Sequence, residues 1–216
     1  MAAAQPKPHQ KTEDFGDLGK YVGQMLQGKA HGEGTYTWKN GGSYTGNFKE
    51  DKPHGAGKLV EIVGGKTFVY EGNFEEGVKS GKGKYSLKDG KVIYDGNWKN
   101  GVFEDDTKKA VYNFPDSEQT YKGQFKNGKF HGYGEMKWPS GVTYKGPWEN
   151  DLMQGKEGEL DFPNGQSYKG EFLNGKREGL GIQLAGPPKD GKEPAGMVEV
   201  KEIYKGNWKD NKRAPK

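Results

Sequence analysis

The sequence predicts an all-β fold, an elongated single-layer antiparallel β-meander built from tandem two-stranded hairpins. Three observations predict it. The tripeptide Tyr-x-Gly occurs eight times, a second glycine pattern follows it at fixed offsets, and bulky side chains alternate with polar ones. Alternation with a period of two residues is typical of strands whose two faces meet different surroundings.

Each repeat begins with a tyrosine, and glycine follows it two residues later without exception. The repeat tyrosines are Tyr21, Tyr44, Tyr70, Tyr94, Tyr121, Tyr144, Tyr168 and Tyr204. A bulky residue stands two positions further on, as Met25, Phe48, Phe74, Trp98, Phe125, Trp148, Phe172 and Trp208. Turn dipeptides such as Asn127-Gly128 come next and predict a tight hairpin, so this part of each repeat is its first strand.

The second strand of each repeat carries Gly-x-Gly and then bulky residues at alternate positions, such as Tyr36 and Trp38. Because directly opposed residues of antiparallel strands share a face, register can be predicted from side-chain size. We expect Trp38 to oppose Tyr44, so that Gly34 opposes Phe48 and an aromatic ring covers each glycine. The intervening residues are polar and predict a solvated opposite face.

We expect residues 1–19 to be a flexible N-terminal segment, residues 20–212 to be the repeat array and residues 213–216 to be a tail. The repeats start near the eight tyrosines, and the last is a half-repeat that caps the array. The fourth repeat lacks Gly-x-Gly and predicts a longer hairpin tip with the acidic run 104–106, a candidate contact. The sixth has shifted glycines, Gly155 and Gly158, which predict a bulge. The seventh carries an inserted loop over 185–196.

Composition limits the function classes. The chain of 216 residues has no cysteine and a net charge of +4 from 34 basic and 30 acidic residues, nearly all the bases being lysine. Base readout favours arginine, so no nucleic acid is expected. No apolar run approaches the roughly 20 residues that span a bilayer, and no signal peptide is present. We therefore expect a cytoplasmic protein that is neither secreted nor membrane-spanning.

The pattern Tyr-x-Gly-x-Phe/Trp followed by Gly-x-Gly, at a period of about 23 residues, resembles MORN repeats from Tyr21 to Trp208. The resemblance implies an elongated, single-layer twisted meander with an aromatic groove. It also implies a non-catalytic scaffold, since small proteins made only of such repeats are similar to radial spoke head and other ciliary or cytoskeletal components. The expected setting is therefore a ciliary axoneme or another cytoskeletal assembly.

The aromatic face is the candidate partner-binding surface. A wide exposed apolar surface usually marks a partner site, and a helical or extended segment of a partner protein would fill the groove. The other reading is that curvature packs the rings on one another and leaves little exposed. The candidate residues are Tyr36, Trp38, Tyr44, Phe48, Tyr70, Phe74, Tyr94, Trp98, Tyr121, Phe125, Trp138, Tyr144, Trp148, Tyr168 and Phe172.

Two alternatives stay open. Lys122, Lys145, Lys169 and Lys205 follow the last four repeat tyrosines and form a row that could bind anionic phospholipids, which would make the protein a peripheral membrane adaptor. A third reading is a regulatory module, since such arrays precede kinase or methyltransferase domains in other proteins; with 12 residues after Tyr204, we expect no such domain if the chain is complete. Open sheet edges could pair with a second copy as a homodimer.

The sequence predicts no catalytic site, cofactor or metal. His31, His54 and His131 each precede a Gly-x-Gly, but repeats lie roughly 10 Å apart, too far for histidines of different repeats to share one zinc ion. The stretch 64–67 resembles the end of a phosphate-binding loop, but Val60 replaces the first glycine of that motif. We expect the protein not to be an enzyme.

Overall fold

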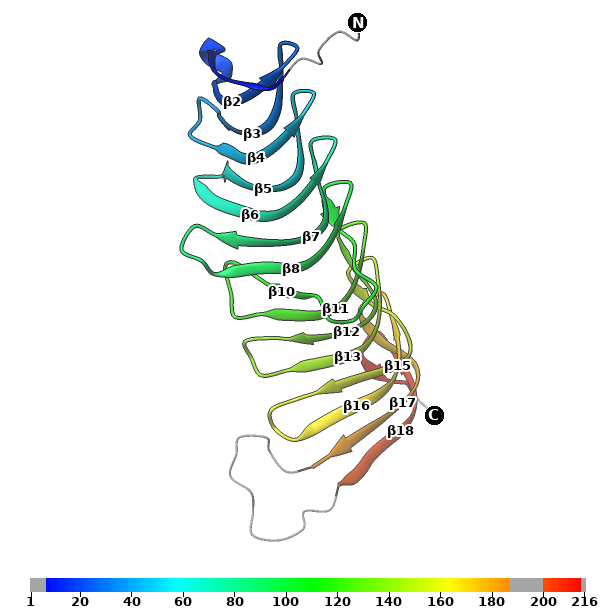
Figure 1. Ribbon diagram of the computed structural model, residues 1–216. Coiled ribbons are helices and arrows are strands. Elements are labelled where there is room, and N and C mark those ends of the chain that lie inside the picture. The colour runs from blue at the N-terminus through cyan, green and yellow to red at the C-terminus, as the bar shows by residue number, and fades with distance from the viewer. Residues whose placement is uncertain (1–6, 187–199, 215–216) are drawn as a thin grey trace, which may run out of the picture. The chain divides into compact units, whose positions relative to one another are not determined.

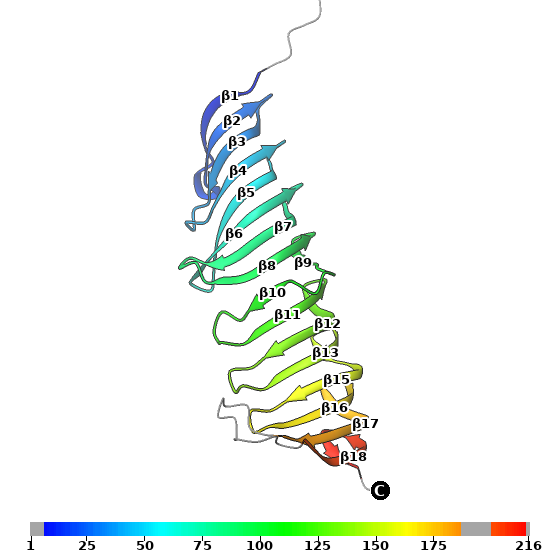
Figure 2. The same cartoon turned by 60° about the horizontal axis from the view of Figure 1, so that its bottom comes forward.

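The computed structural model describes residues 7–186 and 200–214. The chain divides after Val102 into two compact units, and each is a single-layer antiparallel sheet in which successive strands pair. The described residues hold no α-helix, only a 3-10 turn at Gly16–Leu18. The predicted all-β meander of hairpins is therefore confirmed within each unit (Figures 1 and 2).

The first unit runs from β1 to β8 in chain order, and its long strands curve strongly (Figure 1). Its strands are β1 (His9–Asp14), β2 (Lys20–Leu26), β3 (Lys29–Thr37), β4 (Ser43–Lys49), β5 (Lys52–Val63), β6 (Lys66–Glu75), β7 (Val78–Leu87) and β8 (Val92–Lys99). The short β9 (Val102–Phe103) falls at the division between the units.

The second unit continues the hairpins through the half-repeat at its end. Its strands are β10 (Val111–Asn113), β11 (Thr120–Lys126), β12 (Lys129–Lys137), β13 (Thr143–Glu149), β14 (Leu152–Met153), β15 (Gly155–Asp161), β16 (Gln166–Leu173), β17 (Lys176–Ala185), β18 (Lys201–Lys209) and β19 (Lys212–Arg213). The predicted bulge of the sixth repeat is present between Gly155 and Gly158. Of the inserted loop expected over 185–196, residues 187 onward lie outside the described residues.

The tight turns have the geometry that the sequence predicts. Asn127 and Gly128 have φ of 51° and 77°, and Gln27 and Gly28 have 52° and 78°. Positive φ at both central residues defines the type I′ turn, whose twist matches that of the flanking strands. The first glycine of Gly-x-Gly also has positive φ, 65° at Gly55, where a register shift marks a bulge. These glycines are required by backbone conformation.

The register differs from the predicted one by two residues. Tyr36 opposes Tyr44, Gly34 opposes Gly46, and Gly32 opposes Phe48. The connecting turn is tighter than expected, because the Trp38 N–H donates to the Gly42 carbonyl at 2.9 Å, which sets Trp38 opposite Gly42 instead of Tyr44. Trp38 therefore lies beyond the strand ladder. Two residues is one full pleat period, so every side chain keeps its predicted face.

A column of paired glycines crosses each unit. In the first unit the direct cross-strand neighbours are Gly23, Gly34, Gly46, Gly57, Gly72, Gly83 and Gly96. In the first unit the rings of Tyr21, Tyr44 and Tyr70 each lie over two of them. A Cβ at Gly72 would come within 2.6 Å of the Tyr70 Cζ and of the Gly83 Cα. Rings do cover the glycines, as expected, but from a tyrosine diagonal to them rather than from a residue opposite.

Each tyrosine hydroxyl is tied to the backbone three residues ahead. Tyr44 donates to the Asn47 carbonyl at 2.8 Å, and Tyr70 donates to the Asn73 carbonyl at 2.9 Å. Both side chains are 0% exposed. Burial raises the pKa of each to about 12. A ring on glycine with a bonded hydroxyl is therefore the unit of packing that recurs along both units.

Two segments depart from the expected organisation. Residues 9–18, expected to be flexible, form β1 and the 3-10 turn, and β1 pairs with β2 from Asp14 to His9. The expected hairpin tip at 104–106 instead lies against β11, where Asp105 bridges to Phe125. Asp105 is 4% exposed and accepts hydrogen bonds from the N–H and hydroxyl of Thr107. Asp105 is thus part of the packing of the second unit, whereas Asp106 is exposed.

Replacing a column glycine should therefore destabilise the array. Gly83→Ala places a methyl group inside the Tyr70 ring. We expect a loss of about 3 kcal/mol in the free energy of unfolding, because neither backbone nor the packed ring can yield. Urea unfolding followed by circular dichroism measures it. Gly186→Ala is the control, since its methyl would meet only ordinary contacts at 3.5 Å or more. Equal curves for the two variants would contradict this packing.

Alkaline pH should destabilise the fold through the same tyrosines. The pKa is raised to about 12 in the folded chain at Tyr44, Tyr70 and Tyr168, against about 10 when unfolded. The folded state keeps its protons longer, so stability is complete below pH 10 and falls as pH rises from about 10 to 12. Urea midpoints at pH 8 and pH 11 measure the loss. Equal urea midpoints at pH 8 and pH 11 would contradict it.

Candidate partner-binding surface

The predicted partner-binding rings are mostly interior. The exposed, partner-accessible trough that the sequence predicted is absent at twelve of the fifteen candidates, which are at most 6% exposed. They are Tyr44, Phe48, Tyr70, Phe74, Tyr94, Trp98, Tyr121, Phe125, Tyr144, Trp148, Tyr168 and Phe172. Tyr36 and Trp138 are half-buried, and Trp38 is 37% exposed. The second reading, in which the rings pack on one another, holds at those twelve.

The rings bury one another in an edge-to-face zigzag along each unit. In the first unit the ring centroids of Tyr44 lie 5.0 Å from Phe48 and 4.9 Å from Phe74, at interplanar angles of 86° and 80°. Tyr70 continues the contact from Phe74 to Trp98 at 5.1 and 4.9 Å. Edge-to-face pairs of this kind add stability beyond their buried area. One face of the sheet, the ring face, thus forms its own core.

A second layer of side chains covers this zigzag. Each belongs to the ninth residue after a repeat tyrosine, here called the cover position. It pairs across the tight turn with the bulky residue of the first strand, as Phe74 pairs with Lys79 and Phe125 with Phe130. The residues at this position are Ala30, Pro53, Lys79, Phe103, Phe130, Met153, Arg177 and Arg213. Their size differs greatly, so the rings beneath them are covered unequally.

Large cover residues close the ring face. The Phe130 ring stacks on Tyr121 at a centroid distance of 4.0 Å. The Lys79 ammonium lies 4.8 Å from the centroid of Tyr85 and 5.2 Å from that of Trp98, and pairs with Glu61 at 2.7 Å. The Arg177 guanidinium lies 4.4 Å from the ring of Trp208. Cations at such distances are attracted by the negative faces of the rings.

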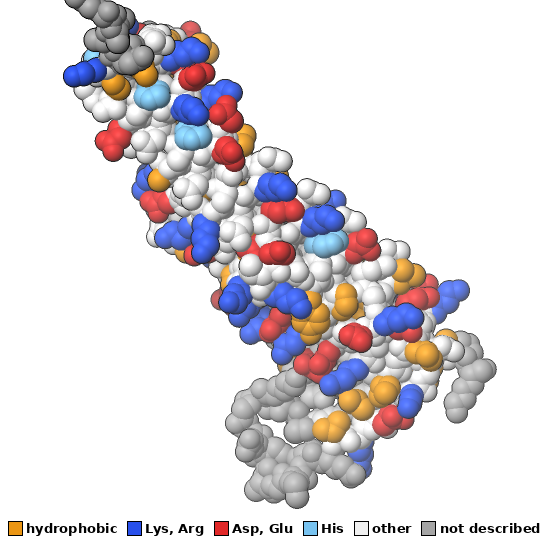
Figure 3. All heavy atoms as spheres, turned by 45° about the vertical axis from the view of Figure 1, so that its right-hand side comes forward, with side chains coloured by type: hydrophobic (Ala, Val, Ile, Leu, Met, Phe, Trp, Pro, Cys, Tyr) orange, Lys and Arg blue, Asp and Glu red, His pale blue; other side chains and the backbone are white. Residues whose placement is uncertain are grey.

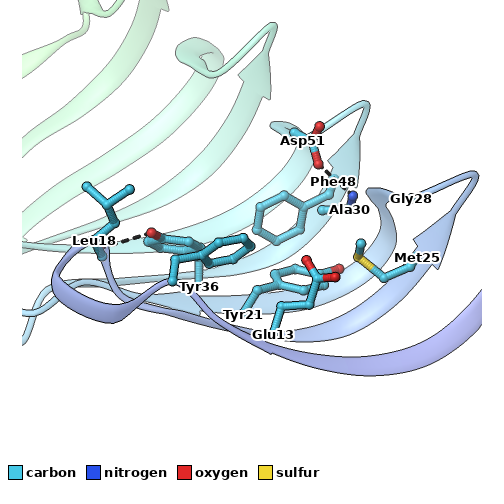
Figure 4. Close-up of a pocket in the computed structure, with 10 residues that line it drawn as sticks. Glu13, Leu18, Tyr21, Met25, Gly28, Ala30, Tyr36, Phe48 and Asp51 are labelled. Atoms are coloured by element: carbon cyan, nitrogen blue, oxygen red, sulfur yellow. Dashed lines mark hydrogen bonds between the residues drawn. The ribbon is translucent and has the colours of Figure 1, made fainter.

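Small cover residues leave the ring face hollow in the first unit. Beside Ala30 lies a first hollow of about 370 Å³, with Tyr21, Met25 and Phe48 in its wall. Figure 4 shows the side chains of this hollow converging from β1, β2, β3 and β4. Beside Pro53 lies a second hollow of about 490 Å³ that Trp38 and Phe74 also line.

Exposed apolar side chains surround the two hollows. Phe15 and Leu18 border the first hollow and are 45% and 71% exposed. Ile62 and Val63 border the second, at 39% and 61%. Strand periodicity and side-chain type did not single out these four residues or the two small cover residues. The available signal was the cover position itself, which is small only in the first two repeats.

The lysine row lies on the opposite, polar face. Lys122, Lys145, Lys169 and Lys205 are all exposed. Carboxylates separate the first three, however. In the strand register Glu135 lies directly opposite both Lys122 and Lys145, and Glu159 lies directly opposite both Lys145 and Lys169. The Lys169 ammonium lies 2.9 Å from Glu159. Figure 3 shows basic and acidic side chains interspersed on the face it presents.

The described residues contain no group of three or more His, Asp or Glu side chains that could hold a metal ion. His31, His54 and His131 lie in separate hairpins, before the first glycine of each Gly-x-Gly. In the same part of the chain no helix is long and apolar enough to cross a membrane.

Comparison with known proteins agrees with the repeat geometry. No curated protein matches the chain. The MORN repeat matches eight segments, each beginning at one of the repeat tyrosines: residues 21–43, 44–60, 70–92, 94–104, 121–143, 144–167, 168–184 and 204–214. These segments cover most of the sequence, and the chain therefore belongs to the MORN-repeat family.

Proposed function

We propose that this chain is a non-catalytic scaffold that binds a partner protein through the ring face of its first unit. The observation that carries the proposal is the cluster of exposed apolar side chains around the two hollows. Phe15, Leu18, Trp38, Ile62 and Val63 each expose more than a third of their surface there. Isolated apolar residues on a surface need no explanation, but a group bordering concave sites is typical of a protein interface.

The edges of the sheet do not favour self-association in the same way. The outer strand β1 has the sequence HQKTED and is exposed along nearly its whole length. Charged and polar side chains on an edge strand oppose pairing with another sheet. The ring face of the first unit is therefore a better candidate for the interface than a homodimer through β1.

Protein binding is favoured over the lipid alternative by the charges of the polar face. Glu135 and Glu159 separate Lys122, Lys145 and Lys169, so a membrane would meet carboxylates together with ammonium groups. Attraction to an anionic leaflet grows with the number of basic residues near it and is opposed by acidic ones. The ciliary axoneme, or another cytoskeletal assembly, is the setting that we propose from the resemblance to radial spoke head proteins.

Proximity labelling in ciliated cells tests the proposal. We expect Trp38→Asp with Ile62→Asp to remove the main labelled partners and to leave the fold intact, because both side chains are exposed beside the second hollow. Leu180→Asp is the control, since Leu180 is 63% exposed in the second unit. An unchanged partner set in the double variant would count against the proposal, and a cytoplasmic set without axonemal or cytoskeletal proteins would count against the setting.

Vesicle binding separates the two candidate functions. We expect no co-sedimentation with phosphatidylserine vesicles at 0.15 M salt. Carboxylates lie beside three of the lysines, and salt further screens the attraction of exposed lysines to the anionic lipid. Replacing Lys122, Lys145, Lys169 and Lys205 by glutamine should then change nothing. Binding that falls with rising salt and disappears in this variant would support the membrane adaptor instead.

A further inference from the structure

We propose that the two hollows are sockets for two basic side chains of the partner, one in each hollow, spaced one repeat apart. The inference rests on the proposed function and deepens it by naming the chemistry of the partner. It starts from a property of the chain itself. Other repeats fill the same place with their own side chain, and those built-in occupants show what the place accepts.

The backbone around the first hollow is the same as in repeats where the place is filled. The Ala30 N–H donates to Asp51 Oδ1 at 2.7 Å, and the Asp51 N–H donates to the Ala30 carbonyl at 3.1 Å. Phe130 makes the same two bonds with Asp151, at 2.8 and 3.1 Å. Since these bonds match, the small side chain of Ala30 accounts for the open space beside it, where Phe130 fills the corresponding place.

Three of the built-in occupants are cations. Lys79, Arg177 and Arg213 stand at the cover position, and each lies within 5.5 Å of the centroid of a repeat tyrosine. Lys79 has only 13% of its side chain exposed. The ring face therefore accepts a nearly buried ammonium group when a carboxylate and aromatic rings surround it, because these replace the lost water.

The hollows carry the same recognition groups. Glu13 and Asp51 line the first, and no basic residue does. Glu13 pairs with Lys11 through Oε1, and Asp51 bonds Ala30 through Oδ1, so the second oxygen of each has no partner among residues 7–186 and 200–214. The charge of Asp51 reaches the ring beneath, since burial and then Asp51 raise the pKa of Tyr21.

The second hollow offers rings and one carboxylate. Trp38, Tyr44 and Phe74 line it, together with Glu61, whose Oε2 already holds Lys79. No basic residue lines this hollow either. A cation there would share the one carboxylate, Glu61, with Lys79. In the first hollow Glu13 is shared with Lys11, but Asp51 adds a second carboxylate, so we expect the first hollow to be the stronger of the two.

The spacing of the hollows matches an α-helix. One repeat is two strands, or roughly 10 Å across the sheet. Residues i and i+7 of a helix lie about 10.5 Å apart on the same side. Tyr36 lines the first hollow and Trp38 lines the second, and their ring centroids are 5.2 Å apart. We expect these two rings to meet the residues between the two cations.

The test uses helical peptides of 18 residues, rich in alanine and leucine, with two arginines, two glutamines or two glutamates seven residues apart. Fluorescence anisotropy with the full chain measures their dissociation constants. We expect the arginine peptide to bind at least about tenfold more tightly than the glutamine peptide, and the glutamate peptide not to bind. Equal affinity for the arginine and glutamine peptides would overturn the proposal.

Filling the hollows locates the binding. Ala30→Phe copies Phe130 and Pro53→Lys copies Lys79, so each should fold while weakening the arginine peptide about tenfold. Glu33→Phe is the matched control, because it adds the same ring to β3 on the polar face, where Tyr133 stands in the fifth repeat. Urea unfolding verifies each fold. Unchanged affinity in folded Ala30→Phe and Pro53→Lys would overturn the proposal.

The two proposals fail differently. If Trp38→Asp with Ile62→Asp removes the labelled partners, but Ala30→Phe and Pro53→Lys change neither the labelled partners nor the peptide affinity, the scaffold stands and the sockets are wrong. If Ala30→Phe weakens binding of the arginine peptide while Trp38→Asp with Ile62→Asp leaves the labelled partners unchanged, the sockets stand and the scaffold function fails.

Discussion

The structure depends on a tyrosine ring lying over two paired glycines. In a single-layer sheet no second layer covers the backbone, so the side chains of the sheet must do it. The ring of Tyr70 covers Gly72 and Gly83, and its hydroxyl then satisfies the Asn73 carbonyl. One side chain thus shields two strands and bonds a third residue. Glycine normally weakens a strand, but here any larger residue would remove the space in which the ring lies.

This constraint explains why most of the fold could be predicted from the sequence. Tyrosine and glycine recur at fixed offsets because the ring reaches a fixed distance, and the tight turns recur because type I′ geometry needs residues that tolerate positive φ. The register could not be fixed by size matching, since facing Gly34 with Phe48 or with Gly46 keeps the same faces. The bond from Trp38 to Gly42 decides between them, and it depends on turn geometry that side-chain size does not encode.

The candidate site was predicted less well, because exposure depends on what lies above the rings. Alternation indicates which side chains share a face, but it does not show that Phe74 packs between Tyr44 and Tyr70. Nor does it show that Phe130 or Lys79 closes the layer from the ninth position of the repeat. The signal was nevertheless present in the sequence. Aligning the repeats by their tyrosines places Ala30 and Pro53 where other repeats have long or aromatic residues.

The cover position separates stability from recognition. Where a repeat carries the glycine column and its ring, both must be kept, because a larger residue would remove the space for the ring. The cover residue is added on top and makes few backbone demands, as the matching bonds of Ala30 and Phe130 show. A large residue there closes the ring face, whereas a small one leaves rings and carboxylates to be filled by another molecule. The same scaffold can therefore be closed in one repeat and open in another by a single side chain, without altering the strands beneath.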